Sequence, residues 1–208
     1  VGPIVALWTE LSAALEPGGG GDIAPLAFTL FCDVNTEVAT ESQTGSIAAP
    51  FATLQQAHDA FDPVIGGTIV VCQGDDDTTY ATADFDRNIA IIGLSSGISN
   101  VSLDEIGVSA SISLDLQNVR CAVVRVTGED DFSITARDCD FDTIENGAGN
   151  LTMHDCQVRG SEAGSSISCG VLQATDCGVQ GSVLTASGII AVNSTFGGDS
   201  IDDVMTAG

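Results

Sequence analysis

Lysine is absent from this sequence, so apart from two histidines its basic side chains are five arginines. They are opposed by 29 aspartates and glutamates, and the formal net charge is -24 over 208 residues. Proteins that bind nucleic acids depend on cationic contacts to phosphate, and an anionic membrane repels a polyanion at low ionic strength. The charge balance therefore excludes nucleic acid as a partner and argues against docking on an anionic membrane.

Disordered chains of high charge usually have low hydrophobicity, and this chain does not. Hydrophobic residues make up 44% of the sequence, which is enough to build a core. Two interpretations of the acidity stay open. The carboxylates either keep a surface soluble and prevent self-association, or they indicate a halophilic protein, since a Debye length of about 3 Å at 1 M salt makes self-repulsion tolerable.

Tryptophan, tyrosine and histidine are scarce, and the cysteines do not form the closely spaced pairs that bind metals. Trp8 and Tyr80 are the only residues of their types, so the stacked aromatic platforms that commonly hold sugars are missing. His58 and His154 are the only histidines, and no C-x-x-C pair occurs, which disfavours a zinc site. Seven cysteines cannot all pair within the chain. We predict buried free thiols and leave one disulfide open.

Proline is absent after Pro63, as expected where most residues lie in hydrogen-bonded strands. In this part of the chain an eight-residue pattern recurs, at 134–141, 151–158, 172–179 and 189–196. An apolar residue opens each copy, Asp or Asn stands fifth, Cys or Ser sixth, and Phe or Val closes it. Self-similarity at a period of about 20 residues is typical of a solenoid in which each repeat is one coil.

Within the pattern, apolar alternation predicts a strand with one buried face, and the Asp or Asn predicts a corner in left-handed backbone geometry. Extending the pattern towards the N-terminus gives openers at Ile69, Ile89, Leu114, Ile134, Leu151, Leu172 and Ile189. We therefore predict an all-β fold, a right-handed parallel β-helix of about seven coils of about 20 residues. The alternative is a β-sandwich of short alternating strands.

Two columns of residues follow from this frame. The corner residues, predicted to stack about 4.8 Å apart as a polar ladder, are Asn118, Asp138, Asp155, Asp176 and Asn193. The residues after them, predicted to fill one small buried slot, are Val119, Cys139, Cys156, Cys177 and Ser194.

The chain divides into three predicted parts: 1–31, 32–67 and 68–208. The first is an anchoring or oligomerisation segment with a glycine-rich hinge, whose helical apolar face comprises Ile4, Leu7, Trp8, Leu11 and Leu15. This helix is too short to span a bilayer. It either docks on a partner or folds back over the first coil.

The second part contains a predicted capping helix. Thr53 and Gln56 have the spacing of a capping box, in which each side chain satisfies the other's backbone N–H. The face expected to close the open end of the solenoid comprises Leu54, Ala57, His58 and Phe61. The third part is the β-helix itself.

Calcium is the one metal that the sequence suggests. Asp75, Asp76 and Asp77 offer adjacent oxygen ligands, but their spacing does not match an EF-hand loop. The alternative is solvated surface charge, and no other cofactor is expected.

Residues 33–80 carry a resemblance to a known family by motif, and residues 81–196 carry it only by coil pattern. The motif begins with Asp-Val-Asn-Thr at 33–36 and ends with Gly-Gly-Thr-Ile at 66–69, Gly74, Asp75 and a delayed Tyr80. Between them it keeps Pro50, Phe51, Thr53, Leu54, Gln55 and Ala57. This stretch resembles the entrance of pectin-lyase-like right-handed β-helices, above all those of bacteriophage tail spikes, fibres and other virion projections. The resemblance implies a homotrimer on the virion or outside the cell. Its N-terminal segment would contact other capsid or tail proteins, and its surface a host glycan or receptor.

Enzymes of this kind use paired carboxylates in a groove, or a basic residue with Ca²⁺. The outward-facing candidates here are Asp115, Arg137, Asp140, Glu145 and Arg159. With 29 carboxylates, some pair at catalytic distance is expected by chance, so we predict no catalytic residues. The expected function is that of a non-enzymatic virion spike, fibre or capsid-decoration protein in host attachment. The alternatives are a polysaccharide-degrading tailspike or secreted pectate-lyase-like enzyme, and a cell-surface adhesin module.

Overall fold

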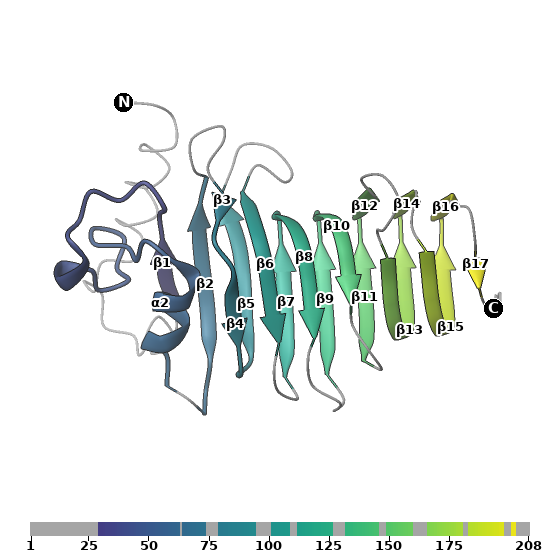
Figure 1. The fold of residues 1–208 in the computed structure, drawn as a ribbon, viewed down its shortest axis with the longest axis horizontal. Helices are drawn as coiled ribbons and strands as arrows, with labels where there is room; N and C mark the ends of the chain where they lie inside the picture. The colour runs from purple at the N-terminus through teal and green to yellow at the C-terminus, as the bar shows by residue number, and fades with distance from the viewer. Residues whose placement is uncertain are drawn as a thin grey trace, which may run out of the picture.

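The computed structural model describes residues 29–62, 64–73, 79–94, 101–108, 112–126, 132–145, 149–159, 166–180, 183–197 and 201–202. Within them the chain is a parallel β-solenoid, with one α-helix and one short 3-10 helix near its start. Figure 1 shows the strands stacked side by side in chain order from the helical end to the C-terminus. The all-β prediction and the parallel β-helix are confirmed.

One wall, wall A, contains the strand of each repeated pattern. Its strands are β1 (Thr29–Cys32), β2 (Gly67–Cys72), β5 (Ile89–Leu94), β7 (Ser113–Gln117), β9 (Ser133–Arg137), β11 (Asn150–His154) and the second halves of β13 (Ser166–Thr175) and β15 (Val183–Val192). Neighbouring strands pair in parallel, and the openers from Ile89 to Ile189 are partners in successive strands. One register therefore runs through this wall.

Two shorter walls complete each coil. Wall B consists of β3 (Thr79–Tyr80), the first halves of β6 (Ser102–Val108), β8 (Arg120–Val126) and β10 (Asp140–Glu145), then β12 (Gln157–Arg159), β14 (Gly178–Gln180) and β16 (Thr195–Gly197). Wall C consists of β4 (Ala83–Phe85), the second halves of β6, β8 and β10, the first halves of β13 and β15, and β17 (Ile201–Asp202).

The regular part of the solenoid has about five turns, fewer than the seven coils predicted. The two end coils depart from the frame. Gly67, rather than Ile69, is the partner of the opener Ile89, so the first predicted opener was two residues out of register. The coil that opens at Ile189 closes on a strand of only two residues, β17.

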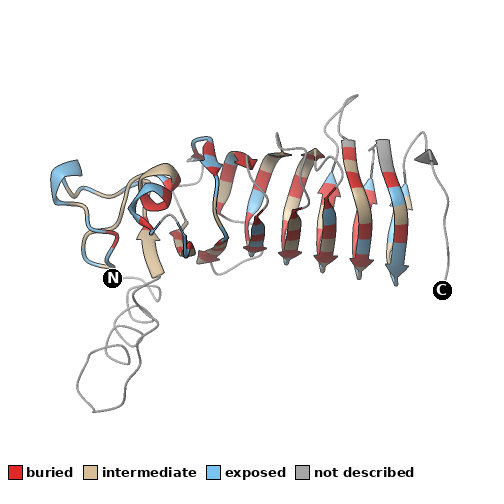
Figure 2. Ribbon diagram, turned by 90° about the horizontal axis from the view of Figure 1, so that it is seen from below, coloured by how far each residue is buried: buried red, intermediate tan, exposed pale blue. Residues whose placement is uncertain are grey.

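The core fills the space between the three walls. Side chains alternate between buried and more exposed along each strand, as the banding in Figure 2 shows. Among the largest fully buried side chains are Tyr80, Phe85 and Phe141 and the openers Leu114 and Ile134. Complete burial of a large aliphatic or aromatic side chain stabilises a fold by about 1.5–3 kcal/mol. The stacked interior therefore provides most of the drive to fold.

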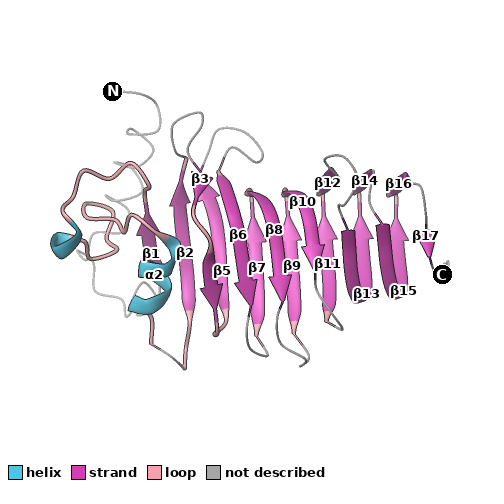
Figure 3. Ribbon diagram, viewed as in Figure 1, coloured by secondary structure: helices cyan, strands magenta, loops and turns pink. Residues whose placement is uncertain are grey.

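The N-terminal end carries the predicted cap, the helix α2 (Leu54–Ala60), preceded by the short 3-10 helix η2 (Thr40–Ser42). The capping box is present: the Gln56 N–H donates to the Thr53 hydroxyl at 3.2 Å and the Thr53 N–H donates to the Gln56 side chain at 3.1 Å. The predicted helix face, Leu54, Ala57, His58 and Phe61, is buried. The helix contacts β1, β2 and β4, and Figure 3 shows it beside β1 and β2.

His58 joins this cap to the first coil. Its Nε2 lies 2.9 Å from an Asp86 oxygen and its Nδ1 lies 3.0 Å from an Asp59 oxygen, and the ring meets Phe85 edge-on. Arg87 donates to the same Asp86 oxygen at 2.8 Å and to the Phe61 carbonyl at 3.0 Å. These bonds tie the end of the helix to the turn after β4.

Tyr80 stabilises the same end of the molecule through hydrogen bonds made in its interior. Its hydroxyl donates to the Cys72 carbonyl at 2.9 Å and accepts from the Val34 N–H at 3.0 Å. Burial raises the pKa of Tyr80 above its usual range, so it stays a neutral donor. The single tyrosine thus points inward from β3 and bonds to the ends of β1 and β2, so it has a structural place rather than one on an outer wall.

Candidate functional site

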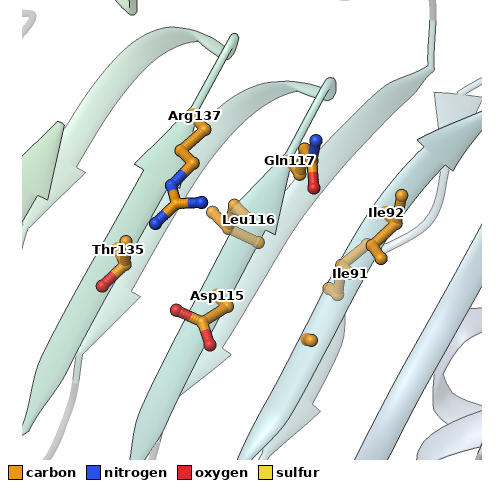
Figure 4. A pocket seen from close by; sticks show the side chains of 8 residues that line it. Ile91, Ile92, Asp115, Leu116, Gln117, Thr135 and Arg137 are labelled. Atoms are coloured by element: carbon orange, nitrogen blue, oxygen red, sulfur yellow. The ribbon is translucent and has the colours of Figure 1, made fainter. Parts of the chain in front are cut away.

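A groove crosses the outer face of wall A over β5, β7 and β9. It is lined by Ala90, Ile91, Ile92, Asp115, Leu116, Gln117, Thr135 and Arg137. Figure 4 shows the polar side chains of β7 and β9 along it, with the Arg137 guanidinium extending back along its strand towards the level of Thr135 and Asp115. Two of the five candidates predicted from the sequence, Asp115 and Arg137, therefore come together here.

Strand alternation and register place these side chains. Leu114 and Leu116 point into the core, so Asp115 between them points outward. Asp115 is the partner of Thr135, and Gln117 is the partner of Arg137. The carboxylate and the guanidinium thus stand diagonally on adjacent coils. Gln117 and Thr135 were not among the candidates predicted from the sequence, although their outward places in the repeated strand could have identified them.

Arg137 differs from the other arginines. No carboxylate of the described residues lies within 4.0 Å of its guanidinium, whereas each of the other four arginines forms an ion pair. The groove therefore combines an available guanidinium with one carboxylate, one hydroxyl and one amide. Such a set can hydrogen-bond a polar ligand, but it holds one carboxylate only, whereas glycoside hydrolysis uses two.

The remaining sequence candidates lie on other walls. On wall B, Arg159 Nε lies 3.5 Å from an Asp140 oxygen. On wall C, Arg125 bridges two coils, with Nη1 2.6 Å from Glu105 and Nε 2.9 Å from Glu145. The two acidic neighbours raise the pKa of Arg125. These carboxylates are engaged in ion pairs and do not face the groove of wall A.

His154 lies on wall A beside the groove, as the register partner of Arg137 on the next coil. His58 belongs to the cap junction described above. The two histidines therefore lie in different parts of the molecule, and neither is placed with a serine and an aspartate as a hydrolytic triad requires.

The predicted corner residues have left-handed backbone geometry. The φ angles are 54° at Asn118, 52° at Asp138, 52° at Asp155, 55° at Asp176 and 52° at Asn193. The backbone N–H of each of the first four donates to a carbonyl of the next coil, as that of Asp155 does to Thr175 at 3.1 Å. At the end of the column the Asn193 amide donates to the Asp176 carboxylate. The stack is half-buried to exposed, so solvent reaches its carboxylates.

The column after the corner is buried except at Ser194, which is half-buried because it lies in the last described coil, so the predicted buried slot is wrong at this position. Val119, Cys139, Cys156 and Cys177 are at most 4% exposed. Each thiol donates to the carbonyl two residues before it, at 3.0–3.1 Å, and the Ser194 hydroxyl does the same at 2.9 Å. All seven cysteines are free. A hydrogen bond between the thiols lowers the pKa of Cys139 and raises that of Cys156 to about 12.

Asp75, Asp76 and Asp77 lie outside the described residues, as do the anchor residues Ile4, Leu7, Trp8, Leu11 and Leu15. In the part that the structure describes, no three metal-binding side chains come together. The described helices include none long and apolar enough to cross a membrane.

Three comparisons, with protein-family models, with curated proteins and with solved structures, found no match for this chain. The fold is consistent with a pectin-lyase-like β-helix.

Proposed function

We propose that this chain is a non-enzymatic structural protein of a virion: a spike, fibre or capsid-decoration protein that projects from the particle or covers it. The observation that carries the proposal is the unbroken register of wall A, which runs from β2 to β15 over one apolar interior. Close-packed interiors resist compression, and the wall extends on the order of 30 Å. Such a rod is suited to holding a surface at a fixed distance.

The state of the outer carboxylates supports the same proposal. Glu105, Glu145 and Asp140 stand near arginines of neighbouring coils, so they link coils rather than frame a substrate. Each such exposed pair contributes only about 0–1 kcal/mol to stability. The resemblance at residues 33–80 adds the virion setting. It also suggests a homotrimer outside the cell, contacts of residues 1–31 with other capsid or tail proteins, and a host glycan or receptor as the target.

Buried thiols fit an extracellular setting without disulfides. Burial raises the pKa of Cys32, Cys72 and Cys121 to about 12 each, which keeps these thiols protonated and unreactive at neutral pH. We expect no cofactor. If Asp75, Asp76 and Asp77 bind structural Ca²⁺, a chelator will lower the melting temperature, and the triple Asn variant will not respond to it.

Immunogold electron microscopy tests the proposal. Antibodies against the purified chain should label projections or the shell of virus particles from cultures of the source organism. Labelling of cell envelopes with unlabelled particles would contradict it and favour the adhesin alternative. Pre-absorption of the antibody with the purified chain is the control.

The groove over Asp115 and Arg137 favours a second candidate, a glycan-binding or glycan-degrading projection. If the chain cleaves a polysaccharide, incubation with a panel of neutral and acidic glycans will release new reducing ends, and Asp115→Asn and Arg137→Ala will each abolish the release. Arg120→Ala is the matched control, because Arg120 lies on wall B, away from the groove. Absence of release with every glycan would leave the structural proposal as the better account.

A further inference from the structure

The two ends of the solenoid are closed to different degrees. At the N-terminal end, residues before α2 cover the edge of β1: the Phe31 N–H donates to the Gly45 carbonyl at 2.8 Å, and the Phe51 N–H donates to the Phe31 carbonyl at 2.9 Å. At the other end β15 pairs with β13, while only Leu184 and Thr185 pair with β17. Among the described residues, 186–192 therefore have no strand on their second edge.

Among the described residues, an inward position of the last coil is exposed at this same end. Ala191 is the partner of Ala174, which is fully buried, yet Ala191 is exposed. On the outer face of the same strand Ile190 is 55% and Val192 is 57% exposed. Grouped apolar exposure next to an unpaired strand edge is typical of an interaction surface.

Charge is absent from β15 and from the residues that flank it, and the nearest charged residue paired with this strand is Asp202 of β17. Residues 177–198 contain no Asp, Glu, Lys, Arg or His, and they form the longest uncharged run in a chain of net charge -24. Unprotected edge strands usually carry a charge or a proline against unwanted pairing, and β15 has neither. Two copies of a strongly anionic chain repel each other, and the 186–192 edge adds no charged side chain of its own to that repulsion.

We propose that the final coil, defined by residues 183–197, docks on the final coil of a second copy of this chain. The 186–192 edge, Ile190 and Val192 are its contacts. Because the β1 edge is covered, a head-to-tail contact has no open partner edge, so the contact joins like ends and closes. The inference goes beyond the proposed function, since it holds equally for a spike, a decoration protein or an adhesin. It is also independent of any trimer formed through residues 1–31.

Sedimentation velocity on the full chain tests the contact, over a concentration series at high NaCl. Ile190→Asp and Val192→Asp place a charge in the contact and should each halve the mass at a given concentration, or raise the dissociation constant about tenfold or more. Gln173→Asp is the matched control. Gln173 is exposed and is the register partner of Ile190 one coil further in, so this variant should keep the wild-type mass.

Ile190→Thr is a milder variant that keeps the test valid if the charged variants misfold. Threonine keeps the β-branched shape that strands favour while removing apolar area, so a smaller shift in the same direction is expected with an unchanged circular dichroism spectrum. A wild-type protein that is monomeric at every concentration would overturn the proposal. Equal masses for the wild type, Ile190→Thr and the folded Asp variants would overturn it as well.

Discussion

Single residues make the corners of this solenoid. Five Asn or Asp residues adopt φ angles of 52–55°, a region in which most side chains crowd the following carbonyl. Asn and Asp tolerate this geometry because their short polar side chains hydrogen-bond locally. This property made the corner positions predictable from the sequence.

We therefore expect Asp155→Ala to lower the free energy of unfolding by about 1–2 kcal/mol, because alanine has no compensation for left-handed geometry. Asp155→Asn should be at least as stable as the wild type, since it keeps the geometry and removes one carboxylate between Asp138 and Asp176. Urea denaturation monitored by circular dichroism measures both. If the Ala variant were as stable as the Asn variant, the corner geometry would not contribute to stability.

Cysteine is the other residue type whose position in the structure determines its behaviour, because burial changes the pKa of the thiol. The pKa values of Cys32, Cys72, Cys121 and Cys156 are raised to about 12, and that of Cys169 to about 11. A group whose pKa is raised by folding stabilises the native state fully below its unfolded pKa, and this contribution is lost as the pH rises towards the folded value. The free energy of unfolding should therefore fall above about pH 9, by up to about 1.4 kcal/mol per pH unit for each such thiol.

Cys156→Ser tests the slot directly. Serine occupies the same slot at position 194 and makes the same bond to the carbonyl two residues before it. The variant should fold, and its loss of stability between pH 9 and pH 11 should be shallower than that of the wild type by one thiol's share. An unchanged alkaline slope would show that Cys156 does not titrate with unfolding.

At the scale of elements, the cap helix was predictable and its attachment was not. Thr53 and Gln56 specify the capping box by spacing alone, and the structure contains it. The bonds of His58 with Asp86 and Asp59, and of Arg87 with Phe61, join residues 26–28 positions apart or lie at the helix end. No local pattern indicates such pairs, because they depend on how the helix docks.

Thr53→Ala should lower the free energy of unfolding by about 1 kcal/mol through loss of the N-cap. Leu54→Ala should cost more, about 2–5 kcal/mol, because it removes a buried side chain from the sealed end. Thr152→Ala, on the outer face of β11, is the control and should stay near the wild type. Thermal denaturation ranks the three, and equal losses for Thr53→Ala and the control would contradict a stabilising cap.

Across the whole molecule, the repeat determines the fold because each coil repeats the same inward positions, so four clear copies suffice to set the register. The error at Ile69 arose where the first coil leaves the pattern: Gly67 takes the opener's place and Val71 aligns with Gly93. The groove was harder to foresee. Asp115 and Arg137 were visible as outward residues, but their meeting on adjacent coils depends on the exact lengths of the loops between them.

The net charge of -24 makes the stability of the whole molecule depend on salt. Salt shortens the Debye length from about 10 Å at 0.1 M to about 3 Å at 1 M, which weakens repulsion among the carboxylates. The melting temperature should therefore rise between low and molar NaCl. Sucrose, which stabilises by exclusion from the protein surface without screening charge, is the control. A rise no larger in NaCl than in sucrose would contradict adaptation to a saline medium.

The central claim, that the chain is a virion component, is tested most directly by quantitative mass spectrometry across a density gradient of particles from the source organism. The account predicts that peptides of this chain peak in the fractions that contain encapsidated nucleic acid, at a fixed ratio to the major capsid protein. Peptides confined to envelope fragments or to the soluble fraction, with none in the particle band, would contradict it.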